Sequence, residues 1–241
     1  MSGRGPWLLA VDTATSVVIV VAARPDGELL ETRTFPAGHR HGSHLLPTIQ
    51  ALVDAAGLAM EELVGVVVGL GPGAFTGLRV GLATAKTLAH ALDRPIVGIS
   101  TGEALLAAAA PGVAGAAARD GTAPRPETAD GGAVLLLPAG PHDRVIVEPG
   151  RPPRLEAGDG GPEPSGAIAV DLEGRASAAA IDRGRAAVAG LPGALVRLGA
   201  ARLAAGETDD VERLVPVYVS LPRGVTTEVG DGGVAWSRDP R

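Results

Sequence analysis

The sequence predicts an α/β fold in which a mixed sheet is covered by helices. Short apolar strands rich in β-branched residues open the chain, amphipathic helical stretches follow, and further apolar strands alternate with those helices. A ββ meander followed by βα units needs both antiparallel and parallel pairing in one sheet. Of the 241 residues, 46% are hydrophobic, so the chain can bury one large core or two small ones.

The first hundred residues carry the clearest elements. The turn signal Arg24-Pro25-Asp26-Gly27 separates two β-branched stretches and predicts a hairpin. Ser43 is the expected N-cap of the first helix, and Gly57 is its expected stop. The expected strands are residues 7–11, 16–23, 28–35, 64–70 and 96–99, and the expected helices are residues 44–56 and 76–92.

A glycine-rich turn joins the fourth of these strands to the second helix. The stretch from Gly69 to Leu92 reads GLGPGAFTGLRVGLATAKTLAHAL, and Gly77 and Gly81 leave a flat helix face where another backbone could come close. Such a turn can pack tightly, or it can hold phosphate with its free N–H groups. Because the glycine spacing fits neither GxGxxG nor GxxxxGK[ST], both interpretations stay open on the residues alone.

Composition narrows the range of functions. A net charge of -6 argues against a protein that grips nucleic acid with its own surface, and an aromatic content of 2% leaves no stacking platform for bases. The absence of cysteine excludes disulfides, iron–sulfur clusters and thiol chemistry. The apolar run near the N-terminus is too short for a signal peptide or a membrane span, so we expect a cytoplasmic protein that makes no membrane contact.

The second half of the chain has a different character. Residues 107–132 and 149–166 are rich in Ala, Gly and Pro, and we expect poorly ordered loops there. Strands are expected at 133–137, 144–148 and 166–170, helices at 176–189 and 194–205, and an extended stretch at 215–219 that returns to the first lobe. The expected domains are residues 1–105 joined by 206–222, a smaller α/β lobe at 106–205, and a disordered tail at 223–241.

Five stretches of the chain resemble the TsaB (YeaZ) family of bacterial proteins, which older labels call glycoprotease-like. They are LLAVDTATS, HGSHLLPTIQALVDAAGL, VVVGLGPGAFTGLRVGLATAKTLA, RPIVGIS and PVYV, and the first four follow the family order over most of residues 7–105. The resemblance implies a two-lobed actin-like, sugar-kinase-like (RNase H-like) fold with mixed sheets flanked by helices, in which the second lobe is reduced.

The same resemblance implies a function. TsaB-like proteins are non-catalytic, TsaD-activating subunits of the complex that forms N6-threonylcarbamoyladenosine in tRNA next to the anticodon. The implied partners are a TsaD-like catalytic subunit and a TsaE-like ATPase, with tRNA reached only indirectly through the complex and a homodimer possible when the chain is alone. ATP, Mg²⁺ and a metal ion are then expected on the partner subunits.

The residues suggest no catalytic, cofactor or metal site in this chain alone. A hairpin that binds Mg²⁺ and phosphate needs an acidic residue, which Asp12 supplies, and a glycine, which this hairpin lacks. A second aspartate is expected at a strand end of the other lobe, but Pro138 occupies that position. The histidine pair that the resemblance places in the catalytic paralogue is missing from residues 100–103. His39, His41 and His44 cluster on a loop, where solvated histidines are favoured over a metal site. We expect no serine-hydrolase elbow and no protease activity.

The predicted function rests on a partner surface formed by the two helices. Their small and apolar side chains exceed what a helix lying on one sheet needs, although burial of both helices within the first lobe remains the alternative. Two other functions stay open: a stand-alone ATP-dependent kinase or transferase, and a homodimeric binding module unrelated to tRNA. The predicted partner-interface residues are Leu45, Leu46, Ile49, Leu52, Val53, Gly77, Leu78, Val80, Gly81, Leu82, Ala85 and Leu88.

Overall fold

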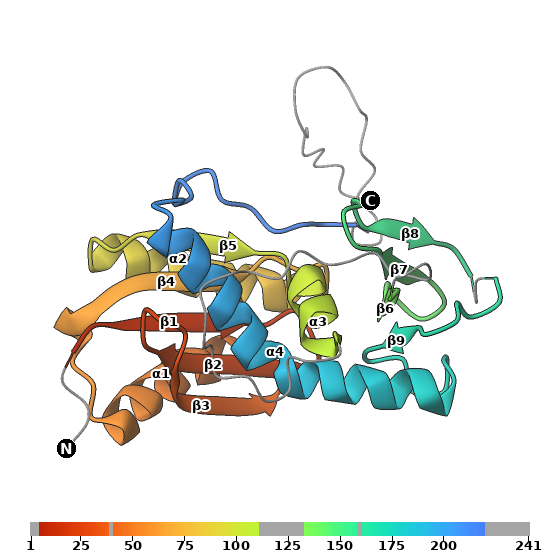
Figure 1. The fold of residues 1–241 in the computed structure, drawn as a ribbon, viewed down its shortest axis with the longest axis horizontal. Coiled ribbons are helices and arrows are strands. Elements are labelled where there is room, and N and C mark those ends of the chain that lie inside the picture. Colours follow the sequence, from red (N-terminus) through yellow and green to blue (C-terminus); the bar gives the residue numbers. More distant parts are fainter. Residues whose placement is uncertain (1–4, 39–40, 111–132, 159–160, 220–241) are drawn as a thin grey trace, which may run out of the picture.

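Two mixed sheets lie side by side along the long axis of the molecule (Figure 1). The computed structural model describes residues 5–38, 41–110, 133–158 and 161–219. Within these residues the first sheet has the strand order β3-β2-β1-β4-β5, and the second has the order β8-β7-β6-β9. The expected fold class, mixed sheets flanked by helices, is confirmed.

The first sheet is built from a meander followed by βα units. β1 pairs antiparallel with β2 and parallel with β4, β2 pairs antiparallel with β3, and β4 pairs parallel with β5. The elements are β1 (Trp7–Asp12), β2 (Val17–Ala23), β3 (Leu29–Pro36), α1 (His41–Ala56), the 3-10 turn η1 (Met60–Glu62), β4 (Leu63–Gly69), α2 (Phe75–Ala91) and β5 (Ile96–Ile99).

The second sheet is smaller and is followed by a long helix. β6 pairs antiparallel with β7 and parallel with β9, and β7 pairs antiparallel with β8. The elements are α3 (Thr101–Ala109), β6 (Leu135–Pro138), β7 (Arg144–Val147), β8 (Arg154–Glu156), β9 (Ile168–Ala169) and α4 (Ala178–Ala204).

Both faces of β1, β2, β4 and β5 are buried, which explains why these strands read as nearly continuous apolar runs, whereas the edge strand β3 is largely exposed. Along β1, Leu9 and Val11 pack toward α1 and α2, whereas Ala10 faces α3 and α4. The core on the α4 side also includes Leu135 and Leu137 of the second sheet. One continuous core therefore joins the two sheets, and α4 runs along both (Figure 1).

Two helices differ from the predictions. The expected N-cap Ser43 lies inside α1, which begins at His41. Helix α3 was not predicted, because its run of alanines reads as the start of the low-complexity stretch at 107–132. Ser100 caps α3 by accepting a hydrogen bond from the Glu103 N–H at 3.2 Å, and the helix is held by its contact with α4.

The second half also contains a longer helix than predicted. The two expected helices at 176–189 and 194–205 form one helix, α4, although Pro192 lies inside it. Leu191, Pro192 and Leu195 are buried, so tertiary packing offsets the hydrogen bond that the proline removes. Strand β8 lies within the expected loop at 149–166, while most of 107–132 and all of 223–241 fall outside the described residues.

The C-terminal segment covers the β5 edge of the first sheet. The Asp209 N–H donates to the Ile96 carbonyl at 2.9 Å, and the Gly98 N–H donates to the Asp209 carboxylate at 2.7 Å. Arg202 donates to the Gly98 carbonyl at 2.9 Å, and the Val217 N–H donates to the Leu70 carbonyl at 2.8 Å. These contacts occupy backbone groups that an edge strand would otherwise leave open to another chain. The predicted domain boundaries remain a prediction.

Helix α4 is long and apolar enough, by length and composition, to cross a membrane. In this fold it packs against both sheets and against α3, and its buried residues run from Ala180 to Ala200. These contacts account for the apolar residues on its packed side.

We predict opposite effects of one substitution at two glycines of α4. A Cβ at Gly184 would lie 1.8 Å from the Ala169 carbonyl oxygen, whereas a Cβ at Gly193 meets nothing within 4 Å. Gly184→Ala should lower the free energy of unfolding by about 2 kcal/mol or more. Gly193→Ala should raise it by up to about 1 kcal/mol, because alanine favours helix. Urea unfolding of both variants checks the pair, and equal effects would contradict the described packing of α4.

Candidate functional site

Three elements meet at the turn between β1 and β2, which comprises residues 12–16 and is called the β1–β2 turn below. The glycine-rich turn that precedes α2 lies against it, and the first turn of α3 supplies a side chain from the other side. Because β1, β4 and β5 are parallel, their carboxyl ends bring these segments together at one edge of the sheet, where α/β proteins commonly bind ligands.

Asp12 is completely buried at this junction. One of its carboxylate oxygens accepts a hydrogen bond from Thr101 Oγ1 at 2.6 Å, and the other accepts from the Ala14 N–H at 2.9 Å. The Thr101 hydroxyl in turn accepts from the Gly71 N–H at 3.0 Å. A Cβ at Gly69 would lie 1.8 Å from Asp12 Oδ2, so the carboxylate packs directly against the Gly69 backbone and leaves no room for a side chain there.

Burial dominates the acidity of this group. Desolvation raises the pKa of Asp12 to about 6, although the hydrogen bonds from Thr101 and Ala14 act in the opposite direction. Such a carboxylate interacts with its own chain and presents no face to solvent. In this geometry it does not fit the role of a Mg²⁺ ligand, which needs an accessible oxygen.

The glycine-rich turn packs against the β1–β2 turn. The Ala74 N–H donates to the Ala14 carbonyl at 2.8 Å, and Thr13 Oγ1 donates to the Gly77 carbonyl at 2.8 Å. A Cβ at Gly73 would lie 2.2 Å from the Ala14 carbonyl oxygen. Of the two interpretations that the sequence left open, the geometry favours close packing, because the chain itself fills the space before α2. The expectation that the chain alone binds no cofactor remains a prediction.

The β1–β2 turn also contacts the second sheet. The Ser16 N–H donates to Asp171 Oδ2 at 2.6 Å, and Ser16 Oγ donates to Asp171 Oδ1. Asp171 follows β9 and has a φ of 57°, in the left-handed region. Sequence analysis singled out neither Ser16, Thr101 nor Asp171. Their shared signal is that each lies just beyond the end of a strand or at the start of the next.

The structure divides the predicted interface residues into two groups. Leu46 is 52% exposed, and Val80 and Leu88 are partly buried on the helix side of the first sheet. The others are buried within the chain: Leu45, Ile49, Leu52, Val53, Gly77, Leu78, Gly81, Leu82 and Ala85. The partner surface stays a prediction, and of the twelve named residues only Leu46, Val80 and Leu88 have side chains that reach the surface.

The idea of an outward-facing Gly77–Gly81 surface is wrong. A Cβ at Gly81 would lie 2.2 Å from Thr13 Oγ1, so this face packs against the chain's own β1–β2 turn. The close backbone approach that the glycines suggested does occur, but within the chain. Gly81→Arg would therefore disrupt the folded chain and would not selectively remove a partner contact.

The pentapeptide Gly98-Ile99-Ser100-Thr101-Gly102 has the G-x-S-x-G spacing at a strand-to-helix turn, so the expectation that this pattern is absent was wrong. Its geometry is that of a helix cap. Ser100 has φ -60°, and its hydroxyl accepts from the Glu103 N–H. A nucleophile elbow instead holds its serine in a strained turn next to a histidine, whereas the Ser100 hydroxyl bonds to the Glu103 N–H and the Gly71 carbonyl.

The histidine cluster is only partly described. His39 and the side chain of His41 fall outside the described residues, whereas His44 is exposed and its ring centroid lies 6.1 Å from that of Phe35. Among the residues that the structure describes, no group of three or more His, Cys, Asp or Glu side chains is placed to hold a metal ion.

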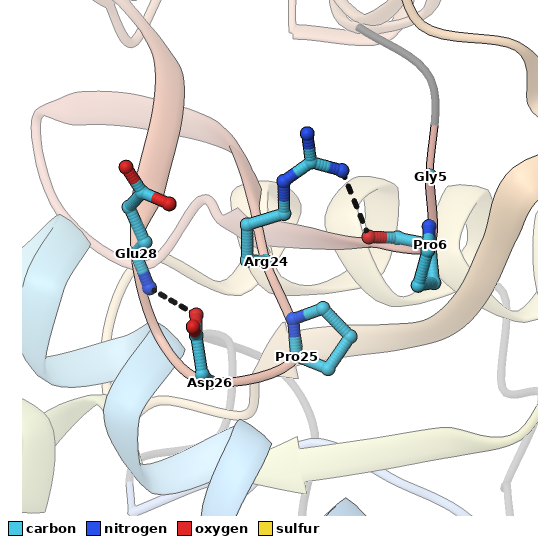
Figure 2. Close-up of a pocket in the computed structure, with 6 residues that line it drawn as sticks. All are labelled: Gly5, Pro6, Arg24, Pro25, Asp26 and Glu28. Atoms are coloured by element: carbon cyan, nitrogen blue, oxygen red, sulfur yellow. Dashed lines mark hydrogen bonds between the residues drawn. The ribbon is translucent and has the colours of Figure 1, made fainter. Parts of the chain in front are cut away.

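Two open surface hollows lie away from the β1–β2 turn. The larger, about 500 Å³, is at the β2–β3 hairpin, where Arg24 donates to the Pro6 carbonyl and the Glu28 N–H donates to Asp26 (Figure 2). The other, about 440 Å³, includes Glu163, whose pKa is lowered by hydrogen bonds from Ser177. In both hollows the polar groups bond to one another, and neither gathers a recognisable catalytic set.

Known proteins share this arrangement of sheets. A solved structure from Pseudomonas aeruginosa, titled as an uncharacterized protein with similarity to peptidase YEAZ, matches with a TM-score of 0.60 and 25% identity, over 89% of this chain and 100% of that one. A second solved structure, YeaZ from Pseudomonas aeruginosa, has a TM-score of 0.60 and 24% identity, over 88% and 99% of the two chains. The chain is therefore a two-sheet α/β protein with the YeaZ fold.

Sequence comparisons converge on the same group. The family model of TsaD, tRNA N6-adenosine threonylcarbamoyltransferase, matches residues 36–119. The protein named tRNA threonylcarbamoyladenosine biosynthesis protein TsaB is 35% identical over 100 residues in Bacillus subtilis, and 33% identical over 94 residues in Escherichia coli. An uncharacterized protein of Mycobacterium tuberculosis is 40% identical over 99 residues.

The chain is similar to the TsaB (YeaZ) family in sequence over about two fifths of its length, and it shares the YeaZ fold over most of its length. The matches cover 41%, 42% and 39% of this chain for the Mycobacterium, Bacillus and Escherichia proteins, and 47%, 43% and 40% of those proteins. The chain thus spans less than half the length of these curated relatives.

The buried Asp12 predicts a specific dependence of stability on pH. Its pKa in the folded chain, about 6, exceeds the ordinary aspartate value of 3.8, so folding favours the protonated carboxyl. The free energy of unfolding should therefore fall as the pH rises from about 4 through about 6, by about 3 kcal/mol in total. Asp12→Asn should lack this fall.

Urea unfolding between pH 4 and 8 measures the difference between the two proteins. Asp93→Asn is the control, because Asp93 is exposed and should leave the profile unchanged. Parallel profiles for the wild type and Asp12→Asn would show that Asp12 does not titrate in this range.

Proposed function

We propose that this protein is a non-catalytic, TsaD-activating subunit of the complex that forms N6-threonylcarbamoyladenosine in tRNA next to the anticodon. It would work in the cytoplasm with a TsaD-like catalytic subunit and a TsaE-like ATPase. In this proposal tRNA is reached through the complex, and ATP, Mg²⁺ and the metal ion belong to the partner subunits.

The observation that carries the proposal is the position of the family match. Residues 36–119, which resemble the TsaD family, include α1, β4, α2, β5 and α3. Both helices on one face of the first sheet, α1 and α2, lie inside this segment. A shared helix pair of this kind is suited to association between two related chains, because equivalent surfaces can pair across a pseudo-twofold axis.

The outer surface of the helix pair supports a docking role. Leu46 on α1 is 52% exposed, and Val80 and Leu88 on α2 are only partly buried. α1 and α2 also contact each other and pack on the same side of the first sheet. A few exposed apolar side chains on adjacent helices can anchor a helix-to-helix interface, since a small number of residues supplies most of the binding energy.

The packing around Asp12 supports a subunit without its own nucleotide chemistry. This carboxylate bonds to Thr101 and Ala14 and is fully enclosed. Residue 138, at the end of β6, is a proline and offers no second carboxylate. A stand-alone ATP-dependent kinase or transferase, the alternative function, would need the β1–β2 turn to separate from the glycine-rich turn before phosphate could enter.

We predict that Leu46→Asp weakens the complex with the cognate TsaD-like protein at least tenfold, because a carboxylate would be buried against an apolar partner surface. Leu155→Asp is the matched control: Leu155 is 44% exposed but lies on β8 in the second sheet. Size-exclusion chromatography and titration calorimetry of the mixed proteins measure the effect. Circular dichroism confirms that both variants fold.

Two outcomes would contradict the proposal. Equal affinities for Leu46→Asp and the wild type would remove the helix pair as the docking surface. Micromolar binding of Mg·ATP by the isolated chain, lost in Asp12→Ala, would favour the alternative of an independent kinase or transferase.

A dimer of the isolated chain that Leu46→Asp dissociates would show the same surface used between two copies.

A further inference from the structure

The contact between Ser16 and Asp171 joins the two sheets of the molecule. The residues lie 155 positions apart in the sequence, and the Asp171 carboxylate accepts from both the N–H and the hydroxyl of Ser16. A carboxylate that accepts two hydrogen bonds from one residue fixes the position of that residue, although both bonds lie at the surface. Asp171 also has a φ of 57°, a conformation that costs energy for a residue with a Cβ. Such strain at a contact between elements suggests a positional role.

From Ser16 a continuous series of contacts leads to α2. Ser16 ends the β1–β2 turn, and two other residues of that turn bond to the first part of the helix. The Ala14 carbonyl accepts from the Ala74 N–H at 2.8 Å, and Thr13 Oγ1 donates to the Gly77 carbonyl at 2.8 Å. The second sheet thus reaches α2 through one five-residue turn.

The fit between this turn and α2 leaves little room for independent motion. A Cβ at Gly73 would lie 2.2 Å from the Ala14 carbonyl oxygen, and a Cβ at Gly81 would lie 2.2 Å from Thr13 Oγ1. Close-packed groups transmit a displacement to their neighbours, because they cannot compress. A shift of the β1–β2 turn must therefore move the first two turns of α2.

We infer that Asp171 is a positioning residue: from the second sheet it holds the β1–β2 turn, and through that turn it sets the placement of the first two turns of α2. Because Val80 lies on the second of these turns, Asp171 affects part of the docking surface through the β1–β2 turn. The effect on partner binding rests on the proposed function, whereas the effect on α2 is a property of the isolated chain.

The test uses a substitution that removes the Asp171 side chain, together with a closely matched control. Asp171→Gly removes the carboxylate while glycine suits the positive φ, so the backbone is not strained further. Asp93→Gly is the control, since Asp93 also has a positive φ, 51°, but lies just beyond the other end of α2, away from the β1–β2 turn. Asp171→Asn keeps one acceptor oxygen and the tolerance for this conformation, and it should give an intermediate effect.

Amide hydrogen exchange of the isolated chain is the first measurement. The reporters are the Ala74 and Leu78 amides, which donate to the Ala14 and Ala74 carbonyls. Asp171→Gly should speed exchange at both by about tenfold, with α1 unchanged. Asp93→Gly should leave both reporters unchanged. Unaltered exchange in a folded Asp171→Gly variant overturns the inference, and Asp171→Asn provides the same test if the glycine variant unfolds.

Affinity for the partner of the proposed function is the second measurement. Asp171→Gly should weaken binding about fivefold to tenfold. Faster exchange with unchanged affinity would overturn the effect of Asp171 on the docking surface, provided that Leu46→Asp weakens binding. If Leu46→Asp also leaves affinity unchanged, the docking surface of the proposed function is wrong, while the exchange measurement still decides whether Asp171 controls α2.

Discussion

The structure depends on the fit between the β1–β2 turn and the glycine-rich turn before α2. Gly69, Gly73 and Gly81 each lie where a Cβ would collide with Asp12, Ala14 or Thr13. Because the close approach involves backbone and short side chains, no larger residue can replace these glycines without moving a strand or a helix. This single junction holds the meander, α2 and the start of α3 in one arrangement.

The junction also connects the fold to the function. Asp12 carries the side chain that the sequence marked as a possible Mg²⁺ ligand. Its carboxylate accepts hydrogen bonds from Thr101 and Ala14 and is fully buried. The exposed apolar side chain Leu46 lies elsewhere, on the outer helix layer. The proposed docking role uses this exposed position, whereas the enclosed carboxylate bonds only to its own chain.

Much of the first sheet could be predicted because its elements are local patterns. The strand at β4, the glycine-rich turn and α2 follow from apolar periodicity and glycine content, and the observed bounds differ from the expected ones by about a residue. The second half could be predicted less well. Helix α3 and the continuity of α4 through Pro192 depend on mutual packing of small residues, which periodicity in an alanine-rich sequence does not reveal.

The sequence by itself determined the α/β class, the order of the first elements, the family resemblance and the two helices that could bind a partner. Tertiary structure alone decided which side of each helix is available. It turned Gly77 and Gly81 inward against Thr13, left Leu46 exposed, and brought Asp171 to Ser16 across 155 residues. The physical reason is that periodicity reports how a segment alternates between apolar and polar positions, whereas the partner that covers each apolar face is fixed only when distant segments pack together.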